Sequence, residues 1–221
     1  MMKLLRADLH IHTEYSMDCT SSLERIIRCC QELEINCIAI ADHGTVEGAL
    51  KMREIAPFTV IVAEEILTPH GEIMGMFLQE TIPSGLSVAE TIAAIRAQGG
   101  LVNIPHPFDT VRPSALKRKS VEEILSEIDV LEVFNSRNIL PHNLKEALAF
   151  AEKHGIPQSC GSDAHTIQEI GNGYLEMPEF DGSKEGFLKS LVQGKVNGKR
   201  TNPLIHFKSS WAKIKNSFKQ E

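Results

Sequence analysis

Histidine and carboxylate side chains recur in short motifs along this chain, and these residue types bind divalent metal ions. The motifs, in chain order, are Asp8-Leu-His10-Ile-His12, Asp42-His43, Glu64-Glu65, His106-Pro107 and Asp163-Ala-His165. Alternation along a strand predicts that Asp8, His10 and His12 share one face, where two imidazoles can converge on one ion. Each motif alone is a weak signal, because two histidines on a strand are as often surface or hydrogen-bonded core residues.

Short apolar runs alternate with helical patterns along nearly the whole chain. The runs predict strands at 4–9, 37–41, 58–66, 73–78, 101–104, 130–134 and 158–160. Helical spacing predicts helices after Ser21 or Ser22, near 46–50, from Ser87 to Gly99, and over 120–127, 142–154 and 184–192. Such alternation implies a mainly parallel sheet with helices outside it. About seven strands in one domain indicate a closed or nearly closed barrel, smaller than the eight-unit barrel of about 250 residues.

The candidate ligands follow the ends of these predicted strands, which is the reason for treating them as one site. In parallel strand–helix units, all strands direct their carboxyl ends at the same rim. Without metal, five imidazoles and several carboxylates gathered there would carry a large desolvation cost and repel one another on protonation. With divalent ions they form a set of nitrogen and oxygen ligands suited to Zn, Mn or Fe.

Composition excludes several classes of protein. The 221 residues carry a formal charge of −6, which disfavours stable nucleic-acid binding because phosphate contacts need a concentrated positive surface. The five cysteines are scattered, without a Cys-x-x-Cys pair, as expected for a reducing compartment. No run of about 18 apolar residues occurs, so no membrane segment is expected. We expect a cytoplasmic protein whose oligomeric state the sequence leaves open.

Taken in order, the motifs resemble those of the PHP family, which is named for polymerase and histidinol phosphatase domains. The resemblance covers about residues 6–173 and includes Gly161-Ser-Asp163-Ala-His165. It implies an α/β fold, a distorted (β/α)7 barrel in a single domain. We place that domain at 1–205 and expect an amphipathic helical tail at 206–221. The resemblance also implies two or three divalent ions that serve the hydrolysis of phosphate esters.

The resemblance also implies a set of ligands for each ion. The first ion is assigned His10, His12, Glu65 and Asp163; the second shares Glu65 and takes His106; the third takes Asp18, His43 and His165. Glu65 is chosen over Glu64 because the family pattern has a small residue two positions before the ligand, as Ala63 is here. Many members supply a further histidine to the second ion from the next strand, but here that strand reads Glu72-Ile-Met-Gly-Met.

The expected reaction is hydrolysis of a small phosphate ester, a monoester or a nucleotide-type ester, by metal-activated hydroxide. Asp163 is expected to bind metal and to accept a proton, and His165 or His43 either ligates or protonates the leaving oxygen. Arg137 follows a predicted strand at the same rim. Its guanidinium is either a bidentate holder of phosphate or one half of a surface ion pair.

Two other functions fit the same residues. Polarising a carbonyl group uses similar metal chemistry, so an amide hydrolase is one alternative. A non-catalytic, metal-stabilised module that binds a nucleotide or a partner is the other, and the missing second-site histidine is compatible with it. The basic run from Arg112 to Lys119 is interpreted as a solvated face, and attraction of an anionic substrate is the alternative.

Overall fold

Side chains of the central strands point alternately into two buried layers, one on each face of the sheet. The structure is a computed structural model and describes residues 4–202. In β2 (Cys37–His43), Ala39 and Ala41 face one layer while Ile38 and Ile40 face the other. A strand buried on both faces is typical of a sheet covered by helices.

The strands of the described part of the chain form one sheet in the order β7-β6-β5-β4-β3-β2-β1-β8-β9. The strands are β1 (Leu4–Ile11), β2, β3 (Thr59–Thr68), β4 (Gly71–Met76), β5 (Leu101–Ile104), β6 (Val130–Asn135), β7 (Gln158–Gly161), β8 (Gly173–Pro178) and β9 (Lys195–Gly198). Strands β1, β2 and β3 are parallel to one another, as are β5, β6 and β7. Strands β4 and β8 each run antiparallel to both of their neighbours.

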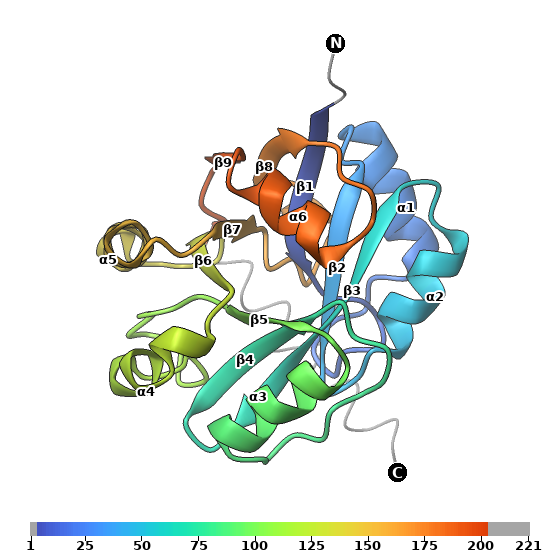
Figure 1. Cartoon of the computed structure of the whole chain (residues 1–221). Coiled ribbons are helices and arrows are strands. Elements are labelled where there is room, and N and C mark those ends of the chain that lie inside the picture. The colour runs from blue at the N-terminus through green and yellow to red at the C-terminus, as the bar shows by residue number, and fades with distance from the viewer. Residues whose placement is uncertain (1–3, 203–221) are drawn as a thin grey trace.

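The helices are α1 (Leu23–Glu32), α2 (Glu47–Ile55), α3 (Val88–Ala97), α4 (Arg118–Glu123), α5 (Pro141–His154) and α6 (Lys184–Leu191), with short 3-10 turns at Leu125–Glu127 and Ile167–Glu169. Helices α1 to α5 lie around the outside of this curved sheet, whereas α6 lies across its interior (Figure 1). Figure 1 shows α1 and α2 on the side of the molecule opposite α4 and α5. Helix α6 adds Phe187 and Leu191 to the inner layer of the barrel.

The chain just after β7 returns to β1 and nearly closes the sheet. Ile11 forms a parallel bridge with Ala164, and the His12 amide donates to the Ala164 carbonyl at 3.0 Å. The result is an α/β domain with a nearly closed, barrel-shaped sheet. The predicted fold class, a distorted (β/α)7 barrel, is confirmed.

The strand connections depart from a regular alternation of strand and helix in two places. Strands β3 and β4 are antiparallel partners with no helix between them, so Thr68–Gly71 is a hairpin turn. Strands β8 and β9 follow β7, which the sequence pattern predicted as the last strand, and β8 pairs with β1. The predicted tail at 206–221 and the boundary at 205 lie outside the described residues.

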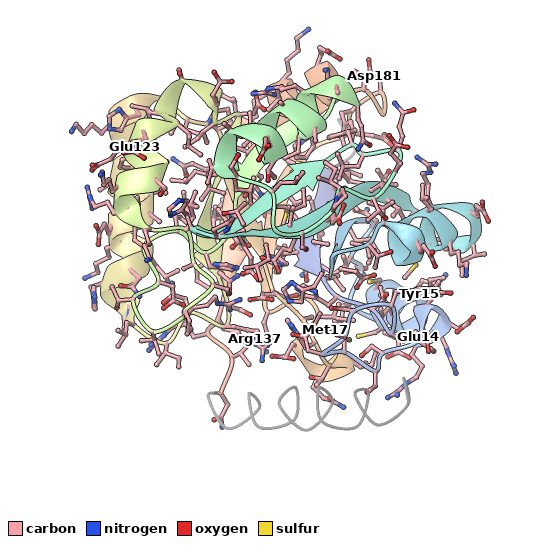
Figure 2. All side chains as sticks on the ribbon, turned by 90° about the horizontal axis from the view of Figure 1, so that it is seen from below. Glu14, Tyr15, Met17, Glu123, Arg137 and Asp181 are labelled. Atoms are coloured by element: carbon pink, nitrogen blue, oxygen red, sulfur yellow. The ribbon has the colours of Figure 1, made fainter. Side chains whose placement is uncertain are left out.

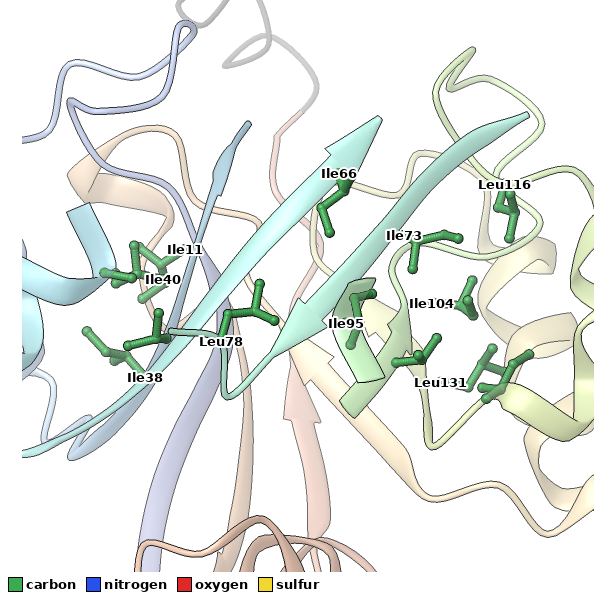
Figure 3. Close-up of a cluster of buried hydrophobic side chains, with 14 of the residues drawn as sticks. Ile11, Ile38, Ile40, Ile66, Ile73, Leu78, Ile95, Ile104, Leu116 and Leu131 are labelled. Carbon is green, nitrogen blue, oxygen red and sulfur yellow. The ribbon is translucent and has the colours of Figure 1, made fainter. Parts of the chain in front are cut away.

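The outer layer of the core lies between the sheet and the helices, and Figure 3 shows part of it. Ile38 and Ile40 on β2 gather with Ile11, while Ile66 and Ile73 on the β3–β4 hairpin lie nearer to Ile95 of α3. The inner layer includes four alanines beside larger residues such as Met74 and Phe187; the alanines are Ala7, Ala39, Ala41 and Ala63. Small inner residues allow the strands to curve tightly around a narrow interior, which leaves the rim for larger polar side chains.

Glycine is required where β7 crosses β1. A Cβ atom at Gly161 would collide with the Cβ of His10, and both residues lie on rigid strands. We therefore expect Gly161→Ala to lower the free energy of unfolding by about 1–3 kcal/mol, the usual cost of overpacking a buried contact. Urea denaturation measures this loss, and an unchanged midpoint would contradict the close approach of the two strands.

Candidate metal centre

The two histidines of the first motif face the barrel interior, whereas the aspartate before them does not. Leu9 belongs to the inner layer and Ile11 to the outer one, so His10 points inward between them. Asp8 lies on the other face, where its carboxylate accepts from the amides of Ser162 at 2.8 Å and Gly171 at 2.9 Å. The prediction that Asp8 shares a face with the histidines is therefore wrong, and β1 has an irregular register after Asp8.

Two histidines and two carboxylates cluster beyond the end of β1. The Nε2 atoms of His10 and His12 lie 3.2 Å apart, and Glu65 Oε2 lies 3.3 Å from each of them. Asp163 Oδ1 lies 3.6 Å from His10 Nε2 and 3.3 Å from His12 Nε2. A tetrahedral ion with ligand distances of about 2.0 Å needs ligand–ligand separations of about 3.3 Å. His10, His12 and Asp163 therefore have the spacing of ligands to one ion, and Glu65 lies within 3.3 Å of both histidines beside them.

Neighbouring carboxylates on β3 point to opposite faces, which separates their roles. Glu65 faces the histidines, while Glu64 Oε2 accepts from the Ile82 amide at 2.9 Å on the outer side. Burial raises the pKa of Glu64 to about 7. Of the two acidic residues at this strand end, Glu65 is the one that the structure brings into the cluster.

Glu72 joins the cluster from a position that sequence reasoning did not assign to it. Because β4 runs antiparallel to β3, its first residues lie at the rim where β3 ends, and Glu72 pairs with Leu67. The Glu72 carboxylate lies 3.5 Å from His43 Nδ1 and 3.4 Å from His106 Nε2. His106 Nε2 also lies 2.9 Å from Glu65 Oε1. Glu72 thus stands beside the second group of ligands, where a histidine was missing from the family pattern.

A third group lies on the solvent side of the first. Ligand atoms of His12, Asp18, His43 and His165 lie within 4.8 Å of one another. Asp18 Oδ2 is 3.1 Å from His165 Nε2 and 3.4 Å from His43 Nε2. The structure therefore brings all eight predicted metal-site residues together at one end of the barrel.

A buried carboxylate behind the cluster holds two of the histidines. Glu132 on β6 has Oε1 at 3.0 Å from His10 Nδ1, and its Oε2 accepts from the His106 amide at 2.6 Å. Asn135 Nδ2 donates to the same Oε2 at 2.9 Å. A carboxylate at Nδ1 fixes the imidazole tautomer and leaves Nε2 for a metal. Sequence reasoning missed Glu132, although a lone glutamate within the apolar run Leu131–Val133 is a signal of a buried, partnered charge.

Charge pairing shifts the pKa values within the cluster. Burial alone would lower the pKa of His12, but the adjacent carboxylates of Asp163 and Glu65 raise it to about 9. Burial opposes ionisation of Asp163, yet Arg112 and His10 hold its pKa well below the usual range. Burial, His12 and Arg137 lower the pKa of His165 to about 3. Asp163 is therefore anionic and His165 is neutral, the states of metal ligands, whereas an ion at His12 must displace a proton.

Two arginines approach the cluster from neighbouring loops. Arg112 Nη2 donates to Asp163 Oδ2 at 2.6 Å, so Arg112 is part of the site rather than of a solvated basic face. Arg137 Nη1 donates to His165 Nδ1 at 2.5 Å, and its Nε lies 3.4 Å from Glu169. Glu169 also accepts from the His165 amide at 3.1 Å. Figure 2 shows Arg137 near Met17, on the side of the molecule away from Asp181.

The backbone is in an unusual conformation at two of the candidate ligands. His106 has φ of 32° and Asp163 has φ of 53°, both in the left-handed region that non-glycine residues rarely occupy. Such conformations cost of order 1–3 kcal/mol and persist where the surroundings impose them, often at functional sites. Each residue follows the end of a strand, where the turn directs its side chain back over the rim.

The three groups open into a cleft of about 460 Å³. Asp18, His43, Glu72 and His165 line it together with both arginines. The side chains of Glu65 and Asp163 lie below them and are fully buried. The cleft therefore gives small molecules access to the outer ligands, and its floor combines anionic and cationic groups.

Comparison with known proteins decides the family. The PHP domain profile matches residues 8–75, and the PHP-associated profile matches residues 141–196, so together they cover more than half of the chain. The chain belongs to the PHP family. An uncharacterized protein of Methanocaldococcus jannaschii is 35% identical to this PHP protein over 213 residues, which cover 95% of this chain and 86% of the relative.

Solved structures share the barrel at low sequence identity. A two-domain protein of Bacteroides vulgatus, which contains a predicted PHP-like metal-dependent phosphoesterase, matches with a TM-score of 0.65 and 15% identity. That match covers 90% of this PHP protein and 66% of the Bacteroides chain. A lesion-specific endonuclease of Pyrococcus furiosus matches with a TM-score of 0.66 and 16% identity, over 91% of this chain and 60% of the endonuclease. These likenesses show the fold.

The donor set of this PHP protein fits divalent metal ions. Glu65 Oε2, Asp163 Oδ1 and Glu72 Oε2 are buried and make no hydrogen bond within the described residues, although each lies close to an imidazole nitrogen. Buried carboxylate oxygens without hydrogen bonds are costly unless a cation pairs with them.

Among the helices of the described residues, none is long and apolar enough to span a membrane.

Proposed function

We propose that this PHP protein is a hydrolase of small phosphate esters that works with two or three divalent ions of Zn, Mn or Fe. The observation that carries the proposal is the buried cluster of His10, His12, Glu65 and Asp163, in which each carboxylate lies within 3.6 Å of both histidines, beneath a cleft that two arginines line. When bound, such ions generate a nucleophile from water at neutral pH and neutralise phosphoryl oxygens.

In this proposal the ligands divide among three positions. His10, His12, Glu65 and Asp163 hold the first ion, and Asp18, His43 and His165 hold the third. Glu65 and His106 hold the second, and Glu72 completes it in place of the histidine found in many relatives. Oxygen-rich ligands of this kind suit Mn or Fe as well as Zn.

The arginines supply the positive charge for the substrate. A guanidinium holds two phosphate oxygens at once, and Arg112 and Arg137 both line the cleft. Arg137 is buried and in contact with Glu169 and His165, which supports a role at the site over a surface ion pair. The low pKa of His165 favours ligation over proton donation to the leaving oxygen. The low pKa of Asp163 likewise favours its role as a ligand over that of a proton acceptor.

Arg137→Ala is expected to raise KM and to lower kcat/KM by about 10- to 100-fold, because a charge-assisted contact to the phosphoryl group is lost. Arg137→Lys should recover only part of the loss, since an ammonium group lacks the bidentate geometry. Steady-state kinetics on the best phosphate ester measure both variants. Arg25→Ala on the exposed side of α1 is the matched control and should behave as wild type. Unchanged kinetics in Arg137→Ala would rule out phosphate holding by this residue.

A substrate panel tests the proposed function. Mn-loaded protein should release phosphate from small monoesters or nucleotides, and should leave small amides and single-stranded DNA intact. The net charge of −6 and the modest volume of the cleft support small esters over polynucleotides. Amide cleavage would favour the amidohydrolase alternative. Bound metal without turnover on the whole panel would favour a non-catalytic module.

A further inference from the structure

Aliphatic side chains surround the mouth of the cleft above its charged floor. Leu67, Val111 and Ile139 line the cleft and are 48%, 50% and 38% exposed. They come from three separate segments: the end of β3, the loop after β5 and the loop after β6. We call these three residues the apolar rim.

Each rim residue is fixed close to a charged group of the floor. Leu67 lies two residues after Glu65 on the same strand and pairs with Glu72, so it stands at the outer end of the face that carries Glu65. Val111 precedes Arg112 directly, and Ile139 lies two residues beyond Arg137. The cleft thus changes from charged to apolar between its floor and its mouth.

Hydrogen bonds hold the rim loops in place. Asp109 Oδ1 accepts from the Val111 amide at 3.0 Å, and Asn143 Nδ2 on α5 donates to the same oxygen at 3.4 Å. The Ile139 carbonyl accepts from Arg200 at 2.8 Å. The exposed aliphatic side chains are therefore presented by anchored backbone, which is the arrangement of a preformed binding surface.

The rim and the floor together define the chemistry of a ligand. Covering aliphatic surface stabilises a complex in proportion to the apolar area removed from water, and the arginines attract an anion. We propose that the cleft selects phosphate esters whose alcohol part is an alkyl or aryl group over esters of sugars and polyols. This inference rests on the proposed function, because it places the phosphoryl group at the floor.

Polar groups at the rim are too few for a polyol. Apart from the histidines of the metal centre, Ser114 is the one neutral polar side chain that lines the cleft, and the Asp109 carboxylate is engaged with the Val111 amide and with Arg112 at 4.0 Å. Hydroxyl groups of a sugar lose hydrogen bonds to water on binding and need replacements. An apolar group has no such requirement, so the rim favours it.

Alkylphosphonates test this inference without the complication of leaving-group reactivity, because their carbon–phosphorus bond is not hydrolysed. Calorimetry of the Mn-loaded full chain measures the Kd of methyl-, butyl- and hexylphosphonate. Each buried methylene is expected to tighten binding by up to about fourfold. Hexylphosphonate should therefore bind at least about tenfold more tightly than methylphosphonate.

Substitutions at the rim locate the effect. The double variant V111S/I139S should bind methylphosphonate as wild type does and lose most of the gain with chain length. Leu148→Ser removes an equally exposed leucine from α5 and should change neither value.

Several outcomes overturn the inference. Equal Kd values for methyl- and hexylphosphonate in wild type would mean that the rim does not contact the alkyl group of the ligand. A chain-length dependence that V111S/I139S retains would place the apolar contact elsewhere. If the proposed function itself fails, the metal-loaded protein binds no phosphonate and cleaves no phosphate ester, a result distinct from tight but length-independent binding.

Discussion

Replacing Asp163 with asparagine is expected to abolish phosphate ester hydrolysis while the fold remains intact. Asp163 Oδ1 lies 3.3 Å from His12 Nε2 and 3.6 Å from His10 Nε2, where it completes the first group of ligands. Asparagine keeps the shape of the side chain but removes the negative charge that a divalent ion requires. We expect kcat/KM to fall by roughly a thousandfold or more. This exceeds the loss of 10- to 100-fold that is typical when a residue that hydrogen-bonds to a metal ligand is replaced.

The same substitution releases Arg112, which donates to Asp163 Oδ2 in the wild-type protein. Kinetics should therefore be paired with circular dichroism and thermal unfolding, to separate loss of chemistry from loss of structure. Asp181→Asn is the matched control, since Asp181 is fully exposed on the far side of the molecule from Arg137. Near-normal turnover in Asp163→Asn would remove its assigned role. Equal losses in both variants would point to a general defect.

Loading the chelated protein with Mn or Zn is expected to raise its Tm substantially. An ion present at a thousandfold excess over its Kd stabilises the folded state by about 4 kcal/mol, provided that it does not bind the unfolded chain. For a chain of this size, that corresponds to roughly 8–16 °C in Tm. Differential scanning calorimetry measures the shift, with Mg or Ca at the same concentration as the comparison for ligand preference.

The shift in Tm on loading should also grow with pH. The pKa of His12 in the folded protein is about 9, above its ordinary value of 6.5, so proton binding stabilises the metal-free fold. This contribution is fully present below pH 6.5 and is lost as pH rises through 9. An ion must displace the same proton, so metal affinity rises over that interval. A larger metal-induced shift at pH 6.5 than at pH 9 would contradict proton–metal competition at His12.

Much of the barrel could be predicted because its local patterns agree with its packing. Strand β2 reads as a continuous apolar run, since one face contacts the helices and the other contacts the interior. Strand β8 was missed for the opposite reason. Its residues alternate between buried and partly exposed, it begins at Gly173 and ends at Pro178, and its partner β1 is more than 160 residues earlier in the chain. The six residues from Gly173 to Pro178 give only a short alternating pattern, and the distant pairing with β1 adds no local signal.

The site was predictable where ligands follow the carboxyl ends of parallel strands, and it was not where the topology changes. Glu72 stands at the start of β4, and only the antiparallel direction of that strand brings it to the rim. Arg112 belongs to a basic run, and its contact with Asp163 depends on how the loop after β5 folds back. Asp8 was assigned to the wrong face because the register of β1 changes after it, which strict alternation does not anticipate.

Elemental analysis of protein purified without chelator tests the central claim most directly. The convergence of ligands from β1, β2, β3, β4 and the loops after β5 and β7 predicts two or three transition-metal ions per chain, and fewer in Asp163→Asn. Protein that is isolated without such ions, and that takes up neither Mn, Zn nor Fe on incubation, would contradict the claim that these side chains form a metal centre.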